Sequence, residues 1–284
     1  MQLNYVKIEK ALLVELGFAI LLSMKRKTKS RTTPLDGPTL DKVKVRFANT
    51  IDFSQYPFSL PIIKNLKEIE FPNQVTFFVG ENGAGKSTIL EAIALNAGFG
   101  IEGGSKNISF KTSEERTYTG TQKFADCLIL SWRAKPKNGY FFRAESFFNV
   151  ANHIDQIAKI DFRIYDSYGG KSLHEQSHGE SFLSFFSNRL SHGGFFIFDE
   201  PEAALSPQRQ LSLLAIIHEL CTKTDSQFII ATHSPLLLAY PNATIYSCDA
   251  DSLTRIAYTE TQHYQITKQF LDNPDRYLHH LFKD

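Results

Sequence analysis

The sequence predicts an α/β fold built around a mostly parallel sheet, and two observations support this prediction. First, the unbroken apolar runs 195–198 and 228–231 have the composition of central strands buried on both faces. Second, the stretch between them reads as a helix from Pro207 to about Lys223, with Ser206 as its N-cap. Strands that alternate with helices in this way favour a parallel sheet with polar residues gathered at the strand ends.

The remaining elements are expected in chain order, with antiparallel strands flanking the sheet on its amino-terminal side. Residues 98–126 are rich in Gly, Ser and Thr and should form short antiparallel strands and turns instead of a helix. The other expected strands are 43–47, 75–79, 127–132, 140–142 and a weakly alternating stretch after Thr244. The other expected helices are 87–96, 146–160, 180–190 and two near the carboxyl terminus, around Ile266 and after Pro274.

The chain is expected to divide into a leader, residues 1–38, and one folded domain, residues 39–284, with a helical lobe at about 146–192. The apolar run 11–24 is too short to span a membrane and contains Glu15. Met24 opens a basic stretch, so we interpret the leader as disordered or as a mis-annotated start, with translation from Met24. A peripheral membrane contact is the less favoured interpretation.

Charge and cysteine content indicate a cytoplasmic protein without an obvious nucleic-acid surface. Residues 1–31 hold seven Lys/Arg and two acids, which leaves 24 basic and 28 acidic residues, a net charge of −4, in the rest of the chain. A body of this sign does not favour nucleic acid, although Arg133, Lys135 and Lys137 form a local basic stripe. The three cysteines show no paired spacing, which is typical of a reducing cytosol.

The strongest motif follows the strand at 75–79 and reads Gly-Glu-Asn-Gly-Ala-Gly-Lys-Ser-Thr from residue 80 to 88. Its glycines allow backbone N–H groups to wrap a phosphate chain, and the helix that follows adds its N-terminal dipole. The order strand, glycine loop, helix is that of a P-loop NTPase, so ATP and Mg²⁺ are the expected ligands. The predicted nucleotide-binding residues are Gly80, Asn82, Gly83, Gly85, Lys86, Ser87 and Thr88, and the Ser87 hydroxyl is also a predicted Mg²⁺ ligand.

Two further motifs end the buried strands of the predicted sheet. Asp199 and Glu200 follow the run 195–198, where Asp199 is placed to hold Mg²⁺ and Glu200 to take the proton of the attacking water. His233 follows the run 228–231 and should emerge at the same edge, where it can donate to the γ-phosphate. We therefore predict Glu200 and His233 as the catalytic pair.

An anion-binding motif, Ser-His-Gly-Glu-Ser at 177–181, opens a predicted helix. If it lies on a separate helical lobe, it cannot easily reach the phosphate loop of its own chain. Ser177 and Gly179 are therefore predicted to contact a nucleotide bound to a second copy.

Together these motifs resemble those of ATP-binding-cassette (ABC-type) ATPases over about residues 40–250. The resemblance assigns Walker A to 80–87, a signature-like motif to 177–181, Walker B to 195–200, a D-loop-like segment to 203–206 and the switch histidine to His233. The strings DEPEAALSPQRQ and FIIATHSPLLLAYP look most like the RecF/SMC and overcoming-lysogenization-defect class, and the whole chain resembles small bacterial AAA family ATPases. The resemblance implies a head-to-tail homodimer that encloses two ATP molecules.

The sequence departs from the family pattern at two places. His178 replaces a glycine of the signature, and Arg143-Ala-Glu145 stands where a glutamine is expected. Glu145 is a candidate Mg²⁺ ligand, with Arg143 facing the γ-phosphate as the alternative. The candidates for stacking on adenine are Phe47, Phe53 and Tyr56.

The leading functional hypothesis is a cytoplasmic ATPase whose ATP-dependent dimerisation drives or licenses a partner, which is a protein or DNA. One alternative is the nucleotide-binding subunit of an ABC membrane transporter, with an integral membrane partner. It is less favoured because Thr-His-Ser-Pro, at 232–235, lacks the acid that usually follows the histidine in transporters. The other alternative is an ATPase associated with DNA repair or phage defence.

Overall fold

The computed structural model describes residues 37–101, 103–105, 119–145, 154–168, 172, 190 and 193–283. The leader, apart from residues 37 and 38, lies outside this part of the chain, as does most of the expected helical lobe. Of that lobe, the structure describes 154–168, which includes a 3-10 helix at Phe162–Tyr168. Within the described residues, no helix combines the length and apolar character needed to cross a bilayer.

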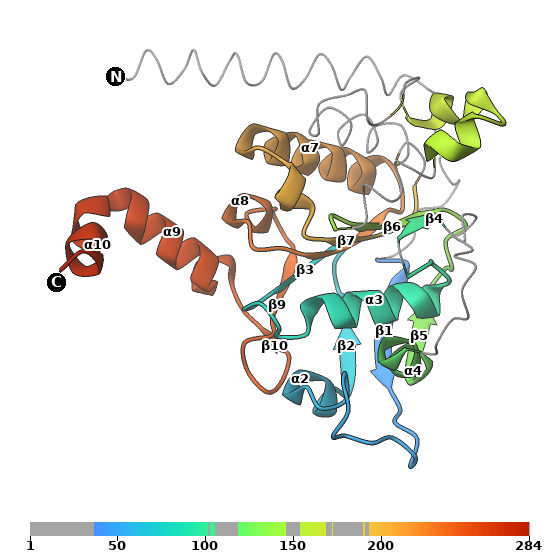
Figure 1. Ribbon diagram of the computed structural model, residues 1–284, viewed down its shortest axis with the longest axis horizontal. Coiled ribbons are helices and arrows are strands. Elements are labelled where there is room, and N and C mark those ends of the chain that lie inside the picture. Colours follow the sequence, from blue (N-terminus) through green and yellow to red (C-terminus); the bar gives the residue numbers. More distant parts are fainter. Residues whose placement is uncertain are drawn as a thin grey trace.

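A sheet with the strand order β10-β9-β3-β8-β7-β6-β4 forms the centre of the described fold (Figure 1). Its five inner strands are parallel: β9 (Thr244–Ser247), β3 (Val75–Val79), β8 (Gln227–Ala231), β7 (Phe195–Asp199) and β6 (Gly139–Arg143). The edge strands β10 (Thr254–Arg255) and β4 (Gly104–Ser105) run antiparallel to their neighbours. The mostly parallel α/β sheet predicted from the sequence is confirmed.

A second sheet of three antiparallel strands lies below the central one in Figure 1, in the order β2-β1-β5. These strands are β1 (Leu40–Val45), β2 (Glu68–Glu70) and β5 (Leu128–Trp132), with the short helix α2 (Pro61–Lys64) between β1 and β2 in sequence. The flanking antiparallel region is therefore present, although its first strand begins at residue 40, before the predicted 43.

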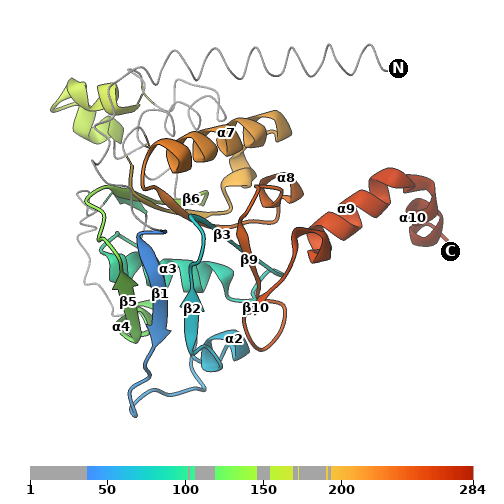
Figure 2. The same cartoon turned by 180° about the vertical axis from the view of Figure 1, so that it is seen from behind.

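Helices cover both faces of the central sheet (Figure 2). On one side lies α3 (Lys86–Ala97), with α4 (Gly120–Asp126) beside it, and on the other lie α7 (Pro207–Lys223) and the short α8 (Pro235–Leu238). In β7, Phe195 and Ile197 pack on the α3 side, whereas Phe196 and Phe198 pack on the α7 side. A strand with apolar partners on both faces needs an unbroken run of apolar residues, and for this reason β7 and β8 could be predicted from the sequence.

One expectation was wrong: residues 120–126 form the helix α4, not strands and turns. Thr119 caps this helix, since its side chain accepts from the Gln122 N–H at 3.2 Å while Gln122 Oε1 accepts from the Thr119 N–H at 2.9 Å. This capping box satisfies two backbone donors of the first turn. Phe124 is completely buried in the core that also contains α3, so tertiary packing stabilises a helix of low intrinsic propensity.

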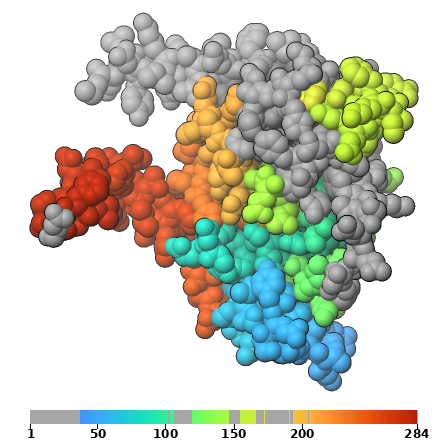
Figure 3. Space-filling model, in the orientation of Figure 1, coloured from blue at the N-terminus to red at the C-terminus, as the bar shows by residue number. Residues whose placement is uncertain are grey.

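The carboxyl-terminal helices α9 (Gln262–Asp272) and α10 (Pro274–Leu281) extend away from the sheet as an arm (Figures 1 and 3). The helices predicted around Ile266 and after Pro274 are confirmed by these bounds. The arm exposes large apolar side chains, among them Ile266, Leu271 and Leu281, and the start of α9 is the part of the arm nearest the central sheet (Figures 1 and 2).

Candidate active site

The glycine loop is shaped by close contacts that exclude side chains at two positions. Gly80 has φ of 142°, and a Cβ there would lie 2.8 Å from Asp249 Oδ1. Gly85 has φ of 96°, and a Cβ there would lie 2.8 Å from a methyl group of Ile62. Both positions therefore require glycine. Gly83 also has positive φ, 84°, but its surroundings are open.

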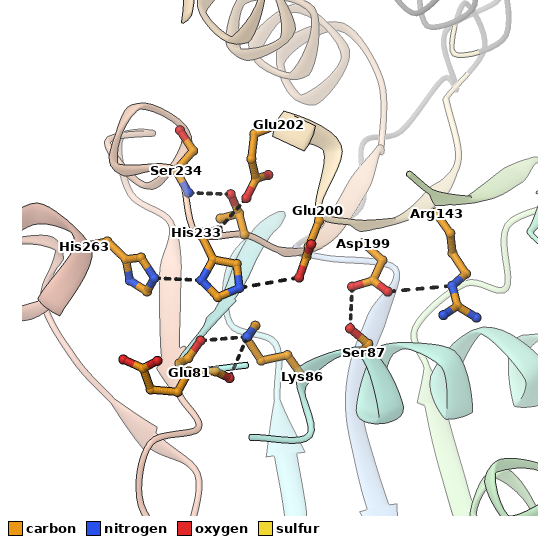
Figure 4. A network of polar contacts seen from close by, with 12 residues as sticks. Glu81, Lys86, Ser87, Arg143, Asp199, Glu200, Glu202, His233, Ser234 and His263 are labelled. Carbon is orange, nitrogen blue, oxygen red and sulfur yellow. Dashed lines mark hydrogen bonds and ion pairs between the residues drawn. The ribbon is translucent and has the colours of Figure 1, made fainter. Parts of the chain in front are cut away.

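The loop delivers its polar groups to the start of α3. Lys86 is buried, and its Nζ donates to the carbonyl oxygens of Gly80 at 2.7 Å and Glu81 at 3.0 Å (Figure 4). The ammonium group therefore lies inside the curve of the loop, where a phosphate chain would bind. Glu81, Asn82 and Gly83 are exposed at the mouth of the loop. Further along, the Thr88 hydroxyl lies 2.8 Å from the Tyr56 hydroxyl.

Asp199 ends β7 directly opposite Ser87, whose hydroxyl donates to Asp199 Oδ1 at 2.9 Å. Burial raises the pKa of Asp199 to about 6, against the lowering effects of the Ser87 hydrogen bond and the Arg143 charge. The buried Asp199 carboxylate and the Ser87 hydroxyl are both hard oxygen donors. Mg²⁺ prefers such ligands and is often held by protein and phosphate oxygens together. The residues present therefore fit the Mg²⁺ ion expected from the sequence.

Glu200 and His233 lie next to this oxygen pair. Glu200 has φ of 51°, an uncommon value for a residue with a side chain, and its N–H donates to the Ala231 carbonyl at 3.0 Å. This conformation leaves its side chain 42% exposed, with Oε1 3.5 Å from His233 Nε2. The His233 N–H donates to Glu202 Oε1 at 2.6 Å, which fixes the backbone that carries the imidazole.

Residues far apart in the sequence thus converge at the carboxyl edge of the central sheet (Figure 4). Lys86 and Ser87 follow β3, Asp199 and Glu200 follow β7, and His233 follows β8, and these three strands are adjacent and parallel. The sequence predicted that the residues at these strand ends would lie close together, and in the structure they do. Ser177 and Gly179 lie outside the described residues.

At the position of the missing glutamine, Arg143 faces the site. Its Nε lies 3.8 Å from Asp199 Oδ2, because Arg143 and Asp199 are register partners in the β6–β7 pair. Its guanidinium also lies 3.2 Å from Glu91 Oε2 and 3.6 Å from Glu145 Oε2. The Glu145 side chain is 88% exposed and reaches the Asp199 carboxylate through this guanidinium.

The candidate aromatic residues lie on the loop between β1 and β2. The rings of Phe47 and Phe53 pack edge to face with centroids 5.3 Å apart, and both rings also contact Phe58. Tyr56 is 61% exposed and contacts the phosphate loop through Thr88. Of the three candidates, Tyr56 is thus the one in hydrogen-bond contact with a predicted nucleotide-binding residue.

Several residues around the site were not identified from the sequence. His263 Nε2 lies 2.9 Å from His233 Nδ1, Asp249 Oδ1 accepts from the Glu81 N–H at 2.8 Å, and Gln210 Oε1 accepts from the Ser234 hydroxyl at 2.5 Å. Burial raises the pKa of the Glu202 carboxyl that holds the His233 backbone. His263 and Asp249 lie outside the motifs of the sequence, so their proximity to the site depends on the tertiary fold.

Comparisons with known proteins agree with this geometry. A family model described as an AAA domain matches residues 53–178, and another, described as "AAA domain, putative AbiEii toxin, Type IV TA system", matches residues 123–239. The AAA-domain matches and the order of strand β3, glycine loop and helix α3 in a mostly parallel sheet agree with a P-loop NTPase fold. The resemblance stated from the motifs is therefore confirmed at the level of the fold. Comparison with curated proteins gives no match.

Solved structures similar to this P-loop ATPase fold share little sequence with it. An SMC head domain from Thermotoga maritima is 17% identical, with 77% of this chain and 98% of that chain covered and a TM-score of 0.40. The cbiO1 part of the ABC transporter complex cbiONQ from Clostridium perfringens is 16% identical, with coverage of 86% and 99% and a TM-score of 0.43. A bacterial Atm1-family ABC exporter with ATP bound is 15% identical, with coverage of 93% and 48% and a TM-score of 0.44.

Proposed function

We propose that this protein binds ATP and Mg²⁺ and hydrolyses ATP to ADP and phosphate in the cytoplasm. The observation that supports the proposal is the meeting of Lys86, Ser87, Asp199, Glu200 and His233 at one sheet edge. A lysine that binds phosphate, oxygen ligands for Mg²⁺ and a carboxylate base are groups that phosphoryl transfer to water uses, and the imidazole adds a hydrogen-bond donor. The free state of all three cysteines is compatible with a reducing compartment.

In this proposal each residue has a separate task. Lys86 exchanges its two carbonyl partners for β- and γ-phosphate oxygens. Ser87 and Asp199 hold Mg²⁺, which when bound neutralises developing charge on the phosphates. The Glu200 carboxylate accepts the proton of the attacking water, and His233 donates from Nε2 to the γ-phosphate. Arg143 adds positive charge beside Asp199, and Glu145 serves as an outer ligand.

We further propose that two copies close head to tail over two ATP molecules, with Ser177 and Gly179 of one copy at the phosphate loop of the other. The exposure of residues 81–83 and of the Glu200 side chain is compatible with a lid supplied by a second molecule. Closure and opening would then drive or license a partner, which is a protein or DNA.

Phosphate release with Mg²⁺ and ATP tests the catalytic proposal. We expect Lys86→Ala to weaken ATP binding at least about tenfold, because charge-assisted hydrogen bonds are lost. Glu200→Gln should bind ATP and lower kcat by about 100-fold or more, because the amide cannot accept the proton of water. Lys64→Ala and Glu68→Gln, the same changes at exposed positions, serve as controls. A Glu200→Gln protein with unchanged kcat would contradict the assignment of the base.

Light scattering on a sizing column tests dimerisation. Glu200→Gln should be a dimer with saturating ATP and Mg²⁺ and a monomer without nucleotide, because hydrolysis no longer reopens the pair. If this protein stays monomeric at saturating ATP, the head-to-tail model is wrong. Copurification from solubilised membranes, with ATPase activity only in the presence of a membrane partner, would instead favour the transporter alternative.

A second candidate function, an ATPase of a DNA-repair or phage-defence system, is favoured by one observation. The family model matching residues 123–239 bears the name of a putative toxin of a type IV toxin–antitoxin system. This candidate predicts that DNA stimulates ATP hydrolysis and that the stimulation falls steeply between about 50 and 200 mM salt. Hydrolysis that is indifferent to DNA at low salt would argue against it.

A further inference from the structure

The start of α9 lies against the switch histidine. His263, the second residue of α9, places Nε2 at 2.9 Å from His233 Nδ1, with ring centroids 5.0 Å apart (Figure 4). His263 comes from the carboxyl-terminal arm, 30 residues beyond His233. The contact is therefore a tertiary one between the arm and the candidate active site.

Other contacts hold the start of α9 in place. Thr261, which is 1% exposed, caps the helix by accepting from the Tyr264 N–H at 3.3 Å. Just before it, the Tyr258 hydroxyl donates to the Pro235 carbonyl at 3.0 Å, and the Tyr258 ring packs on Tyr264 with centroids 4.6 Å apart. Because Pro235 lies two residues after His233, these contacts pack the first turn of α9 against residues 232–235, the segment that carries His233.

The position of protons in this contact follows from the neighbours of His233. Its Nε2 atom is buried, makes no hydrogen bond with the described residues, and lies 3.5 Å from Glu200 Oε1. A carboxylate repels the lone pair of a bare nitrogen, so the proton of a neutral His233 belongs on Nε2. Nδ1 is then an acceptor, and the hydrogen bond at 2.9 Å requires His263 Nε2 to donate.

The surroundings of His263 favour its neutral form. Burial lowers its pKa, and the neighbouring His233 and Lys86 lower it further, against opposing effects of Asp249 and Glu81. With its proton on Nε2, the buried Nδ1 of His263 is a lone pair that has no hydrogen-bond donor in the described part of the chain. Each ring then carries one proton, and both protons point in the direction of the candidate active site.

We propose that His263 is a positioning residue that donates to His233 Nδ1 and thereby holds the His233 Nε2–H toward the nucleotide. This assignment deepens the proposed function and rests on it, because it concerns how the hydrolytic site is kept ready. It also makes the carboxyl-terminal arm a structural part of that site. In this role His263 acts through His233, with which its Nε2 makes the hydrogen bond.

Nitrogen-15 spectra of the imidazoles in the wild-type protein test the proton positions without any hydrolysis. Spectra of His233→Gln and His263→Gln assign the two rings. We expect His233 to be protonated at Nε2 and bare at Nδ1, and His263 to be protonated at Nε2, at neutral pH. A His233 ring protonated at Nδ1 alone would overturn the proposal.

Paired variants test the effect on catalysis. His263→Leu removes the donor, and we expect kcat to fall roughly 10- to 100-fold with KM for ATP nearly unchanged, as for supporting residues elsewhere. His263→Gln retains an N–H donor on a flexible side chain and should restore kcat to within about threefold of wild type. His280→Leu, a similar change on the exposed face of α10, is the control.

The possible outcomes distinguish a failure of the positioning role of His263 from a failure of the proposed ATP hydrolysis. Equal loss in His263→Leu and His263→Gln, or no loss in either, would overturn the positioning role while leaving ATP hydrolysis established. A wild-type protein that hydrolyses no ATP would remove the proposed function, and the proton positions would then be judged from the spectra alone. If His263→Leu fails to fold, the wild-type spectra and His263→Gln decide.

Discussion

At the residue scale, the fold alters the acid–base chemistry of Asp199. It is 7% exposed, and burial raises its pKa from 3.8 to about 6. Below pH 3.8 the carboxyl is protonated in both the folded and the unfolded chain, so burial costs nothing. Above pH 6 it is ionised in both, and the difference between the two pKa values corresponds to about 3 kcal/mol of lost folding free energy.

Asp199→Asn should therefore stabilise the ligand-free protein at neutral pH, while abolishing Mg²⁺-dependent hydrolysis. The neutral amide removes the cost of a buried charge, and its oxygen can still accept from Ser87. We expect the free energy of unfolding to rise by up to about 3 kcal/mol at pH 7 and the gain to shrink as pH falls from 6 to 4. Denaturant titrations at several pH values measure this, with the exposed Asp251→Asn as control. A destabilised Asp199→Asn protein would contradict the assigned cost of burial.

At the scale of elements, the Gln227 side chain makes a buried link between the two sheets. Gln227 begins β8 and is fully buried; its Oε1 accepts from the Leu40 N–H at 2.6 Å and from the Thr39 hydroxyl at 2.9 Å, and its Nε2 donates to the Leu40 carbonyl at 3.0 Å. The amide thus pairs with the backbone of β1 much as another strand would. We expect this contact to contribute to the position of the antiparallel sheet against the central sheet.

Gln227→Leu should lower the free energy of unfolding by roughly 2 to 5 kcal/mol, because the buried N–H and carbonyl of Leu40 lose their partner. The apolar replacement keeps most of the volume, so the loss reports hydrogen bonds more than packing. Chemical denaturation measures it, and Gln208→Leu on the exposed face of α7 is the control. A loss below about 0.5 kcal/mol would show that the two sheets are held together mainly by their apolar contacts.

At the scale of the whole molecule, nucleotide binding should tie together strands that are distant in sequence. A ligand that contacts β3, β7 and β8 at one edge binds only the folded chain. A nonhydrolysable ATP analogue with Mg²⁺ at 100 times its Kd should therefore raise the free energy of unfolding by about 2.7 kcal/mol. Thermal melts measure the shift, which Lys86→Ala should reduce. An equal shift in wild type and Lys86→Ala would place the nucleotide elsewhere.

The sequence by itself determined the parallel strands β3, β7 and β8, the helices α3 and α7, and the polar residues at the strand ends. Burial on both faces demands unbroken apolar runs, and a phosphate loop demands glycine, so both leave a local pattern. The expected leader, the domain limits and the trans role of Ser177 and Gly179 stay predictions.

Only the tertiary structure decided which side chains from unrelated segments meet. Arg143 lies beside Asp199 because of the register between β6 and β7, and His263 lies beside His233 because the chain returns to the site after β10. Helix α4 was not predicted, because its capping box consists of only two residues, Thr119 and Gln122, in a stretch whose composition is typical of turns. Its stability comes from the burial of Phe124 in the core. Strand pairing and packing are non-local interactions, so a residue's neighbours in sequence carry no record of its partners in space.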